Sequence, residues 1–265
     1  MRVAIIGAGN MGGALARGLA KGSRIATSDI YVSNPSTAKL EALKGEFPEI
    51  NTTTDNCVAA SAADLVVLAV KPWKVEEVLN EIKPHVDYSR QAVASMVGGL
   101  GIAQLDKWLD KGGEVLPAAY IIIPNTAIAT MSSMTFISSQ RSTAEQDKFL
   151  VDIFDELGQA MLIDESAMPA ATSLASCGIA YALRYIRAAM EGGVELGIRA
   201  DDAKQIVMQT LRGAVDVLAA NGSHPEAEID RVTTPGGLTI KGLNAMEASG
   251  FTHSVIEGLR ASTKR

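Results

Sequence analysis

The sequence has few of the residues that build metal sites, disulfide frameworks and nucleophilic triads. It contains only two cysteines, Cys57 and Cys177, and three histidines, which stand far apart along the chain. Two isolated cysteines make neither a disulfide framework nor a zinc-binding motif, and the scattered histidines show no metal or triad spacing. We therefore expect no bound metal ion and a reducing, cytoplasmic location.

Long apolar runs and clusters of positive charge are also missing. No apolar run approaches the roughly 20 residues that cross a bilayer. The run Val3–Ile6 is shorter than the apolar core of a signal peptide, which has about 7–15 residues. The net charge is −6, and no run of Lys and Arg is longer than two residues. These features argue against membrane and nucleic-acid partners.

What the sequence does contain is typical of a globular protein. Of its 265 residues, 47% are hydrophobic and 20% are charged, which is enough apolar material for one large domain or two ordinary ones. At the N-terminus a short apolar run leads directly into Gly7-Ala8-Gly9-Asn10-Met11-Gly12. A Gly-x-Gly-x-x-Gly pattern that ends a strand and opens a helix predicts a dinucleotide-binding loop.

The three glycines of this loop have different expected roles. Gly7 allows the tight turn, Gly9 lets the backbone approach a pyrophosphate, and Gly12 lets the helix pack against the strand. The N-terminus of the following helix offers free N–H groups and a partial positive charge to the phosphates.

Strand-like and helix-like segments alternate over the first part of the chain. The run Leu65–Val70 is wholly apolar, as expected of a strand buried on both faces of a sheet. Such alternation predicts a doubly wound parallel sheet covered by helices. The expected strands are residues 3–6, 30–32, 65–70, 91–97, 120–123, 134–137 and 160–163, and the expected helices lie near residues 14–20, 36–44, 74–82, 101–110 and 143–157.

After about residue 165 only helical patterns remain. Asp201 is the expected N-cap of a helix over 202–220, Asn221-Gly222 would end it, and His224-Pro225-Glu226 would start the next helix. We therefore divide the chain into an α/β domain of residues 1–162 and an all-helical domain of residues 163–265. Many small residues in 170–193 permit close helix packing and favour dimerisation.

The end of the second expected strand bears on the cofactor. An Asp or Glu at this position binds the ribose 2′-hydroxyl in folds that prefer NAD. Here the strand continues as Val32-Ser33-Asn34-Pro35-Ser36-Thr37, without a carboxylate that would repel a 2′-phosphate. Ser33, Asn34 and the neighbouring hydroxyls can donate hydrogen bonds to that phosphate, so we predict NADP(H). The alternative is a polar helix cap without a cofactor role.

Several further motifs occur in a fixed order along the chain. They are Ala69-Val70-Lys71-Pro72, Pro124-Asn125-Thr126, Ala175-Ser176-Cys177-Gly178-Ile179-Ala180-Tyr181, Gly192–Gly197 and Val232–Ile240. With the glycine loop they cover essentially the whole chain, and together they resemble the pyrroline-5-carboxylate reductase family, the last enzymes of proline biosynthesis. The Pro-Gly-Gly-x-Thr segment is the most specific of these motifs.

The resemblance implies a Rossmann domain followed by an all-helical C-terminal dimerisation domain that forms homodimers or larger oligomers. It implies transfer of hydride from NADPH to C5 of a cyclic imine, which gives L-proline. Such a transfer needs a well-placed cofactor and substrate but no metal. The resemblance places the cofactor on Ala8, Asn10, Met11, Ser33, Asn34, Asn56, Ala69, Val70 and Lys71.

The substrate of that family carries a carboxylate, which needs hydrogen-bond donors. The segment Thr234-Pro235-Gly236-Gly237-Leu238-Thr239 leads into an expected helix and can present consecutive backbone N–H groups to an anion. The resemblance suggests that Thr239 bonds to the ring nitrogen or relays a proton to it, so Thr239 is the candidate catalytic residue. Glu165 matches a family glutamate near the substrate; the alternative is a solvated residue at a helix start.

The sequence departs from the family pattern at several positions near the expected substrate pocket. Ala127 and Ile179 stand where proline is usual, and Arg231 stands where an asparagine is common. These changes leave a non-catalytic, NADP-binding regulator as an alternative. A β-hydroxyacid dehydrogenase-like oxidoreductase is a second alternative. It is weakened because the stretch Thr172–Glu191 holds arginines but no lysine, and arginine is too basic to serve as the acid and base.

Overall fold

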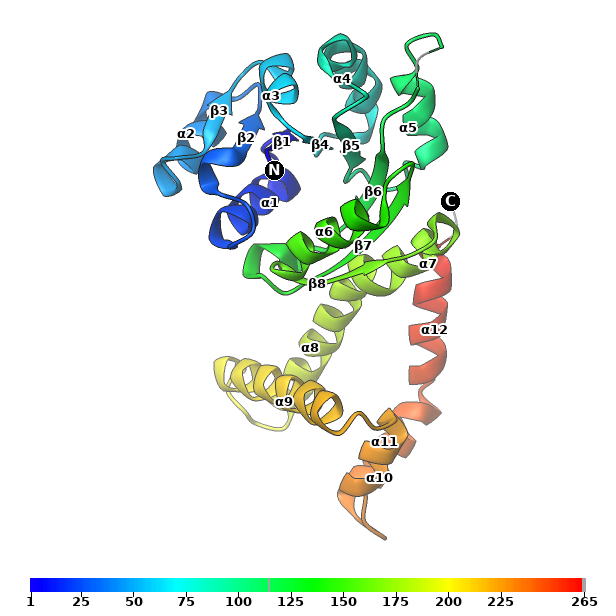
Figure 1. The fold of residues 1–265 in the computed structure, drawn as a ribbon. Helices are drawn as coiled ribbons and strands as arrows, with labels where there is room; N and C mark the ends of the chain where they lie inside the picture. The colour runs from blue at the N-terminus through cyan, green and yellow to red at the C-terminus, as the bar shows by residue number, and fades with distance from the viewer. Residues whose placement is uncertain (114, 264–265) are drawn as a thin grey trace. The chain divides into compact units, whose positions relative to one another are not determined.

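The computed structural model describes residues 1–113 and 115–263, drawn in Figure 1. The chain divides into two compact units, Met1–Ser176 and Cys177–Arg265. The last strand ends at Leu162, and the helical segment after it, up to Ser176, is grouped by its contacts with the first unit. The predicted domain boundary between residues 162 and 163 stays a prediction.

The first unit is built on one eight-stranded sheet, in the order β3-β2-β1-β4-β5-β6-β7-β8. This order contains the arrangement of a dinucleotide-binding fold, whose switch point lies between β1 and β4. The strands are β1 (Val3–Ile6), β2 (Ile30–Ser33), β3 (Asn51–Thr53), β4 (Leu65–Leu68), β5 (Ala92–Ser95), β6 (Ala119–Ile123), β7 (Ser133–Gln140) and β8 (Gly158–Leu162).

Helices cover both faces of the sheet, so alternate residues of one strand enter different cores. Val3 and Ile5 of β1 join the core under α1, α2 and α6, whereas Ala4 and Ile6 join the core under α3, α4, α5 and α7. This burial of both faces explains the continuous apolar strands. The helices are α1 (Asn10–Lys21), α2 (Thr37–Glu46), α3 (Asn56–Ala62), α4 (Val75–Ile82), α5 (Ile102–Leu109), α6 (Ala144–Asp155) and α7 (Met168–Thr172).

Two features of the sheet differ from the sequence prediction. Strand β7 runs antiparallel to β6, so the sheet is not wholly parallel. The connection between them, which contains the short helix η4 (Thr126–Thr130), is too short for the crossover that parallel neighbours need. Strand β3 was not predicted, because Asn51-Thr52-Thr53 lacks an apolar run and lies at the edge of the sheet.

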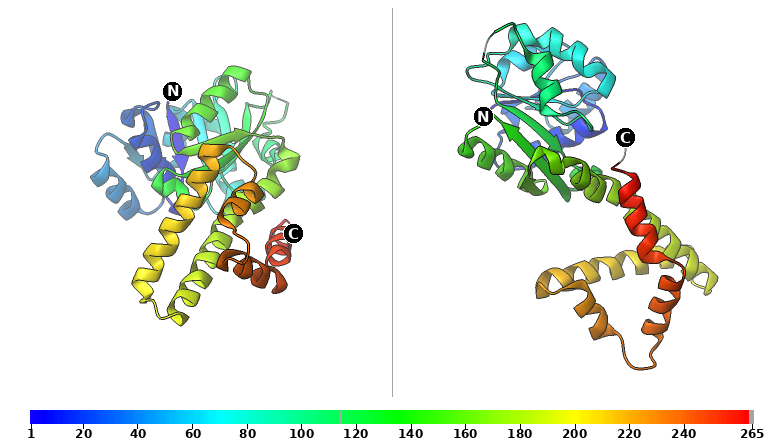
Figure 2. Two further views of the ribbon diagram at one scale, coloured as in Figure 1. Left: turned by 90° about the horizontal axis from the view of Figure 1, so that it is seen from below. Right: turned by 90° about the vertical axis from the view of Figure 1, so that its right-hand side faces the viewer.

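The helical segment after about residue 165 contains an interruption. A π-helical turn, Ser173–Cys177, joins α7 to α8 (Gly178–Glu195). The second unit continues with α9 (Ala200–Asn221), α10 (Pro225–Val232), α11 (Leu238–Ala248) and α12 (Phe251–Ala261), and its described residues form no strand. Figure 2 shows α8 and α9 as a helical hairpin.

The helix ends of the second unit follow the predictions with one correction. Gly222 adopts a left-handed conformation after α9, and His224 caps α10 ahead of Pro225. The prediction that Asp201 caps α9 is wrong, because the N-cap is Arg199 and Asp201 lies in the first turn. The chain turns at Gly197, which has a positive φ, and α9 begins at Ala200, before Asp201. The Asp201 carboxylate lies in the first turn, where its negative charge is favourable near the positive end of the helix dipole. No helix in the described ranges is long and apolar enough to cross a membrane.

Candidate functional site

The glycine loop between β1 and α1 is held tightly on one side and open on the other. Gly7 has φ +107°, and its N–H donates to the Ser33 carbonyl at 2.8 Å. A Cβ at Gly12 would overlap the Gly7 carbonyl oxygen and lie 2.9 Å from the Ala69 Cβ. A Cβ at Gly9 would have no atom of the protein within 4 Å. The open side at Gly9 is therefore the side from which a ligand can approach the backbone.

A cavity of about 480 Å³ lies at the carboxyl ends of β1, β2, β4 and β5. Of the residues predicted to bind a cofactor, Gly7, Gly9, Asn10, Met11, Asn34, Ala69, Val70 and Lys71 line it. Four others, Ala8, Gly12, Ser33 and Asn56, are not among the residues that line it. The cavity thus collects most of the predicted cofactor residues at the switch point of the sheet.

Ser33 is placed differently from the sequence expectation. The carboxylate of Glu81 accepts a hydrogen bond from Asn56 Nδ2 at 2.9 Å, which turns the Asn56 Oδ1 toward Ser33. The Ser33 hydroxyl donates to that oxygen at 2.8 Å, and Ser33 is fully buried. In this arrangement the hydroxyl proton of Ser33 supports the wall of the cavity and is not directed into it.

Asn34 lines the cavity and also holds the glycine loop. Its Oδ1 accepts from the Ala8 N–H at 3.0 Å, and its Nδ2 donates to the Ser36 carbonyl at 3.1 Å. The side chain therefore ties the end of β2 to the turn after β1. Ser36 and Thr37, the other predicted donors, are exposed at the start of α2.

The structure adds lining residues that the sequence analysis missed. Lys39, exposed in the first turn of α2, adds a positive charge to the lining of the cavity, which also includes Asn34 and Pro35. Pro72 extends the turn after β4, and Met96, Val97 and Gly98 follow β5. The rule that ligands bind at the carboxyl ends of adjacent strands predicts the β5 segment. The sequence signal for Lys39 is its position in the first turn of the helix that Ser36 caps, next to the end of the second strand.

These groups fit a dinucleotide. The first three N–H groups of α1 belong to Asn10, Met11 and Gly12 and have no partner within the helix, and the N-cap Gly9 carries no side chain to satisfy them. A pyrophosphate at the open side of Gly9 would accept from these donors and meet the positive end of the helix dipole.

The Pro-Gly-Gly segment of the second unit forms a tight turn. The Gly237 N–H donates to the Thr234 carbonyl at 2.9 Å, and Gly236 has φ +72°, as the third position of a type II turn requires. Gly237 caps α11 without a side chain, so the open donors are the first N–H groups of the helix, from Leu238 onward. Thr239 is exposed in that first turn.

Glu165 belongs to the first unit and has a structural partner there. Its Oε1 accepts from the Ile102 N–H at 2.7 Å and so caps α5, whose N-cap Gly101 has no side chain. Glu165 also lines a cavity of about 720 Å³ with Ser138, Ser139 and Asp164. It is not among the residues that line the cofactor cavity, and its contact with a substrate stays a prediction.

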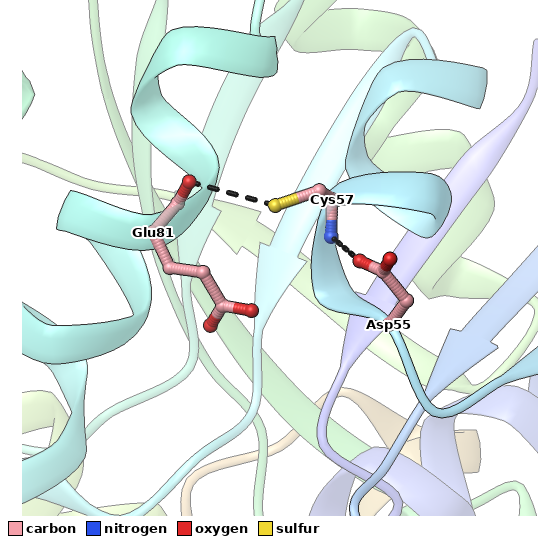
Figure 3. Close-up of side chains that lie close together, drawn as sticks. All are labelled: Asp55, Cys57 and Glu81. Carbon is pink, nitrogen blue, oxygen red and sulfur yellow. Dashed lines mark hydrogen bonds between the residues drawn. The ribbon is translucent and has the colours of Figure 1, made fainter.

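Two carboxylates and one thiol lie close together at the start of α3 and on α4. They belong to Asp55, Glu81 and Cys57, which are drawn in Figure 3. Asp55 Oδ1 accepts from the Cys57 N–H at 2.8 Å as the N-cap of α3, and the Cys57 thiol donates to the Glu81 carbonyl at 3.5 Å. Burial, together with the Glu81 and Asp55 carboxylates, raises the pKa of the Cys57 thiol. Asp55 is thus accounted for as the N-cap of α3, and the Glu81 carboxylate accepts a hydrogen bond from Asn56.

Comparison with known proteins agrees with this arrangement. Residues 165–265 match the family model described as pyrroline-5-carboxylate reductase dimerisation, and residues 2–99 match that of NADP oxidoreductase coenzyme F420-dependent. Pyrroline-5-carboxylate reductase 2 of Dictyostelium discoideum is 36% identical over 99% of this chain and 91% of the relative. Pyrroline-5-carboxylate reductase 1 of the same organism is 37% identical over 99% of this chain, which spans about half (49%) of that relative's length.

Among solved structures, pyrroline carboxylate reductase of Plasmodium falciparum with NADP bound matches with a TM-score of 0.87 and 28% identity, over 99% of this chain and 95% of that one. The sheet order, glycine loop and cavity define a Rossmann-type dinucleotide-binding protein with an all-helical second unit. The chain belongs to the pyrroline-5-carboxylate reductase family. The predicted fold class and the predicted family are both confirmed.

Proposed function

We propose that the protein is a pyrroline-5-carboxylate reductase that uses NADPH to reduce the cyclic imine to L-proline. The observation that carries the proposal is the cavity at the carboxyl ends of β1, β2, β4 and β5, on a chain whose relatives bear that name. When bound, NADPH supplies the hydride. The first N–H groups of α1 hold the pyrophosphate, and Lys71 and Met96 lie in the wall of the cavity.

The preference for NADP(H) is assigned to the end of β2 and the first turn of α2. No carboxylate stands there, and Lys39 lines the same cavity as Asn34. A cation attracts a phosphate with about −2 charge. Lys39→Ala is expected to raise the KM for NADPH and to leave the KM for NADH unchanged, whereas the exposed Lys107→Ala on α5 is a control that changes neither. NADH used better than NADPH by the unaltered protein would contradict the assignment.

The second unit supplies the substrate groups in this proposal. The first N–H groups of α11 bind the substrate carboxylate, and the Thr239 hydroxyl bonds to the ring nitrogen or relays the proton that the product amine gains. Thr239→Ala is expected to lower kcat/KM about 10²-fold or more without changing the affinity for NADPH. Thr239→Ser, which keeps the hydroxyl, is expected to restore most of the activity.

The proposal includes a homodimer or larger homo-oligomer in the cytoplasm. Residues 165–265 match a dimerisation model, and the described part of the second unit buries almost none of its apolar side chains. Cys57 and Cys177 are both free thiols, which suits a reducing compartment.

The test mixes the purified protein with NADPH and pyrroline-5-carboxylate and follows the absorbance of the reduced cofactor. Oxidation that depends on the imine, with proline as the product, is the expected result. Binding of NADPH without oxidation would refute the proposed reaction and would favour the non-catalytic regulator.

A further inference from the structure

Two sequence motifs that the proposed reaction does not use are joined in the structure. Asn125 Nδ2 donates to the Ala175 carbonyl, and the Ser176 hydroxyl donates to the Pro124 carbonyl, each at 3.4 Å. Asn125 is only 6% exposed. These two hydrogen bonds, here called the clasp, fasten the π-turn Ser173–Cys177 to the end of β6.

The orientation of the Asn125 carboxamide follows from its other partner. The Ala127 N–H donates to Asn125 Oδ1 at 3.0 Å, so the amide nitrogen faces the opposite way, toward Ala175. The family usually has proline at position 127, and proline has no N–H to donate. The residue that departs from the family pattern is therefore the one that orients Asn125 in this chain.

The π-turn gives the clasp a geometric consequence. A π-turn inserts one extra residue into a helix, and each residue of an α-helix turns the chain by about 100°, so every later side chain is rotated by that amount. Ala175 lies in the middle of the turn, and α8 begins directly after it at Gly178. Holding the turn thus fixes the helical phase at Ala175 and Ser176, the residues that lead from α7 into α8.

The clasp is also attached to the walls of the cofactor cavity. Strand β6 pairs with β5, and the residues that follow β5, Met96 and Val97, line that cavity. Asn125 is in addition the N-cap of η4, which packs against α1, the helix of the glycine loop. Asn125 therefore lies between the π-turn and two elements that border the cavity.

We propose that Asn125, oriented by the Ala127 N–H, is a positioning residue that holds the π-turn in register with the cofactor cavity and so sets the geometry of hydride transfer. The role in hydride transfer rests on the proposed function. Asn125 touches neither cofactor nor substrate in this proposal, and it acts through the backbone of Ala175 and through the start of α8.

The variant Asn125→Asp is designed to break the hydrogen bond to Ala175 while it keeps the N-cap of η4. The new carboxylate still accepts from the Ala127 N–H, because aspartate is a good N-cap, but its second oxygen faces the Ala175 carbonyl and repels it. We expect kcat to fall about tenfold or more, since small misplacements of reacting groups cost that much. The dissociation constant for NADPH is expected to stay unchanged, and the isotope effect with 4-deuterated NADPH is expected to rise.

Two further variants complete the design. Ala127→Pro removes the orienting N–H and is expected to give a smaller loss of kcat in the same direction. Ser132→Ala removes an exposed hydroxyl of the same segment, which donates to the Thr130 carbonyl, and is expected to change nothing. A merely structural Asn125 would lower the melting temperature of Asn125→Asp but leave kcat and the isotope effect at wild-type values, and that result would overturn the proposal.

Hydrogen exchange provides a readout that does not need the reaction. Loss of the clasp is expected to speed amide exchange in residues 173–180 while exchange in the glycine loop stays the same. Unchanged exchange in 173–180 would overturn the clasp itself. A wild-type protein that binds NADPH but reduces no imine would refute the proposed function and the role in hydride transfer, whereas the exchange result would still decide whether Asn125 holds the turn.

Discussion

The two units of the chain bury their apolar side chains to different extents. In the first unit the strands and the inner faces of the helices fill two closed cores, one on each side of the sheet. In the described part of the second unit, Ala203 is the only apolar residue that is buried, and large apolar side chains on α8, α9, α11 and α12 are exposed.

This difference shows what each unit needs in order to be stable. A sheet with helices on both faces removes its apolar surface from water within one chain. A hairpin of helices followed by separate helices leaves its apolar faces without a partner, and large exposed patches of this kind mark protein–protein interfaces. The first unit is therefore expected to be complete as a single copy, and the second to depend on another copy of the chain.

The largest expected effect comes from placing a charge on this exposed surface. Leu183 on α8 is 59% exposed, and Val58 on α3 of the first unit is 55% exposed. Leu183→Asp is expected to dissociate the oligomer, at a cost of about 2 kcal/mol or more if the residue is central to the interface. Val58→Asp is expected to leave assembly unchanged. Sedimentation measures the oligomeric state of both variants. The same oligomeric state in both variants would contradict the difference between the two units.

The next prediction separates folding from binding within the first unit. Gly12→Ala is expected to destabilise the unit by about 1–3 kcal/mol, because the new Cβ would overlap the Gly7 carbonyl. Gly9→Ala meets no protein atom within 4 Å, so stability is expected to hold while the affinity for NADPH falls. Urea unfolding and NADPH titration test the pair. Tight NADPH binding by Gly9→Ala would show that the open side of the loop is not the ligand side.

A third prediction applies the same reasoning to the second unit. A Cβ at Gly237 would lie 2.6 Å from the Thr234 hydroxyl oxygen and 3.0 Å from its carbonyl oxygen. Gly237→Ala is therefore expected to disturb the turn before α11 and to raise the KM for the imine about tenfold. Pro235→Ala keeps both glycines of the turn and serves as the control. A normal KM for the imine in Gly237→Ala would show that the turn plays no part in substrate binding.

The smallest expected effect concerns pH. Hydrogen bonds from Ser223 and Asn221 and the nearby Arg231 guanidinium lower the pKa of Glu228. A lowered pKa in the folded state means that the stabilisation is present above the usual value near 4.5 and is lost as the pH falls through the folded pKa. The melting temperature of Glu228→Gln is expected to depend less on acid pH than that of the wild type. Glu226→Gln, in the same helix, is the control and is expected to follow the wild type.

Much of the fold could be predicted because its signals are local. The Gly-x-Gly-x-x-Gly loop, the apolar run at Leu65 and the helical pattern after residue 165 each follow from the geometry of one element. The misses depend on neighbours. The direction of β7 follows from a short connection, β3 is a polar edge strand, and Asp201 lost the cap position because the preceding turn starts the helix earlier.

In the candidate site, the roles of backbone groups were predicted better than the roles of side chains. Backbone roles, such as those of Gly7 and Gly12, are encoded in the residue type, because only glycine suits the positive φ at Gly7 and the space at Gly12. At Gly9 the missing side chain leaves the backbone open to a ligand. Side-chain roles were predicted less well. Ser33 carries a suitable hydroxyl, but that hydroxyl donates to Asn56, whose orientation is set in turn by Glu81, 25 residues further along the chain on α4.

By itself the sequence determined the family, the order of elements and the glycines that admit a ligand, because these depend on local conformation and on motifs read along the chain. Only the tertiary structure decided which polar groups face the cavity, that Lys39 lies beside it, and that Asn125 fastens the π-turn. Hydrogen bonds between residues distant in sequence fix these orientations, and no local pattern records which partner a side chain will find.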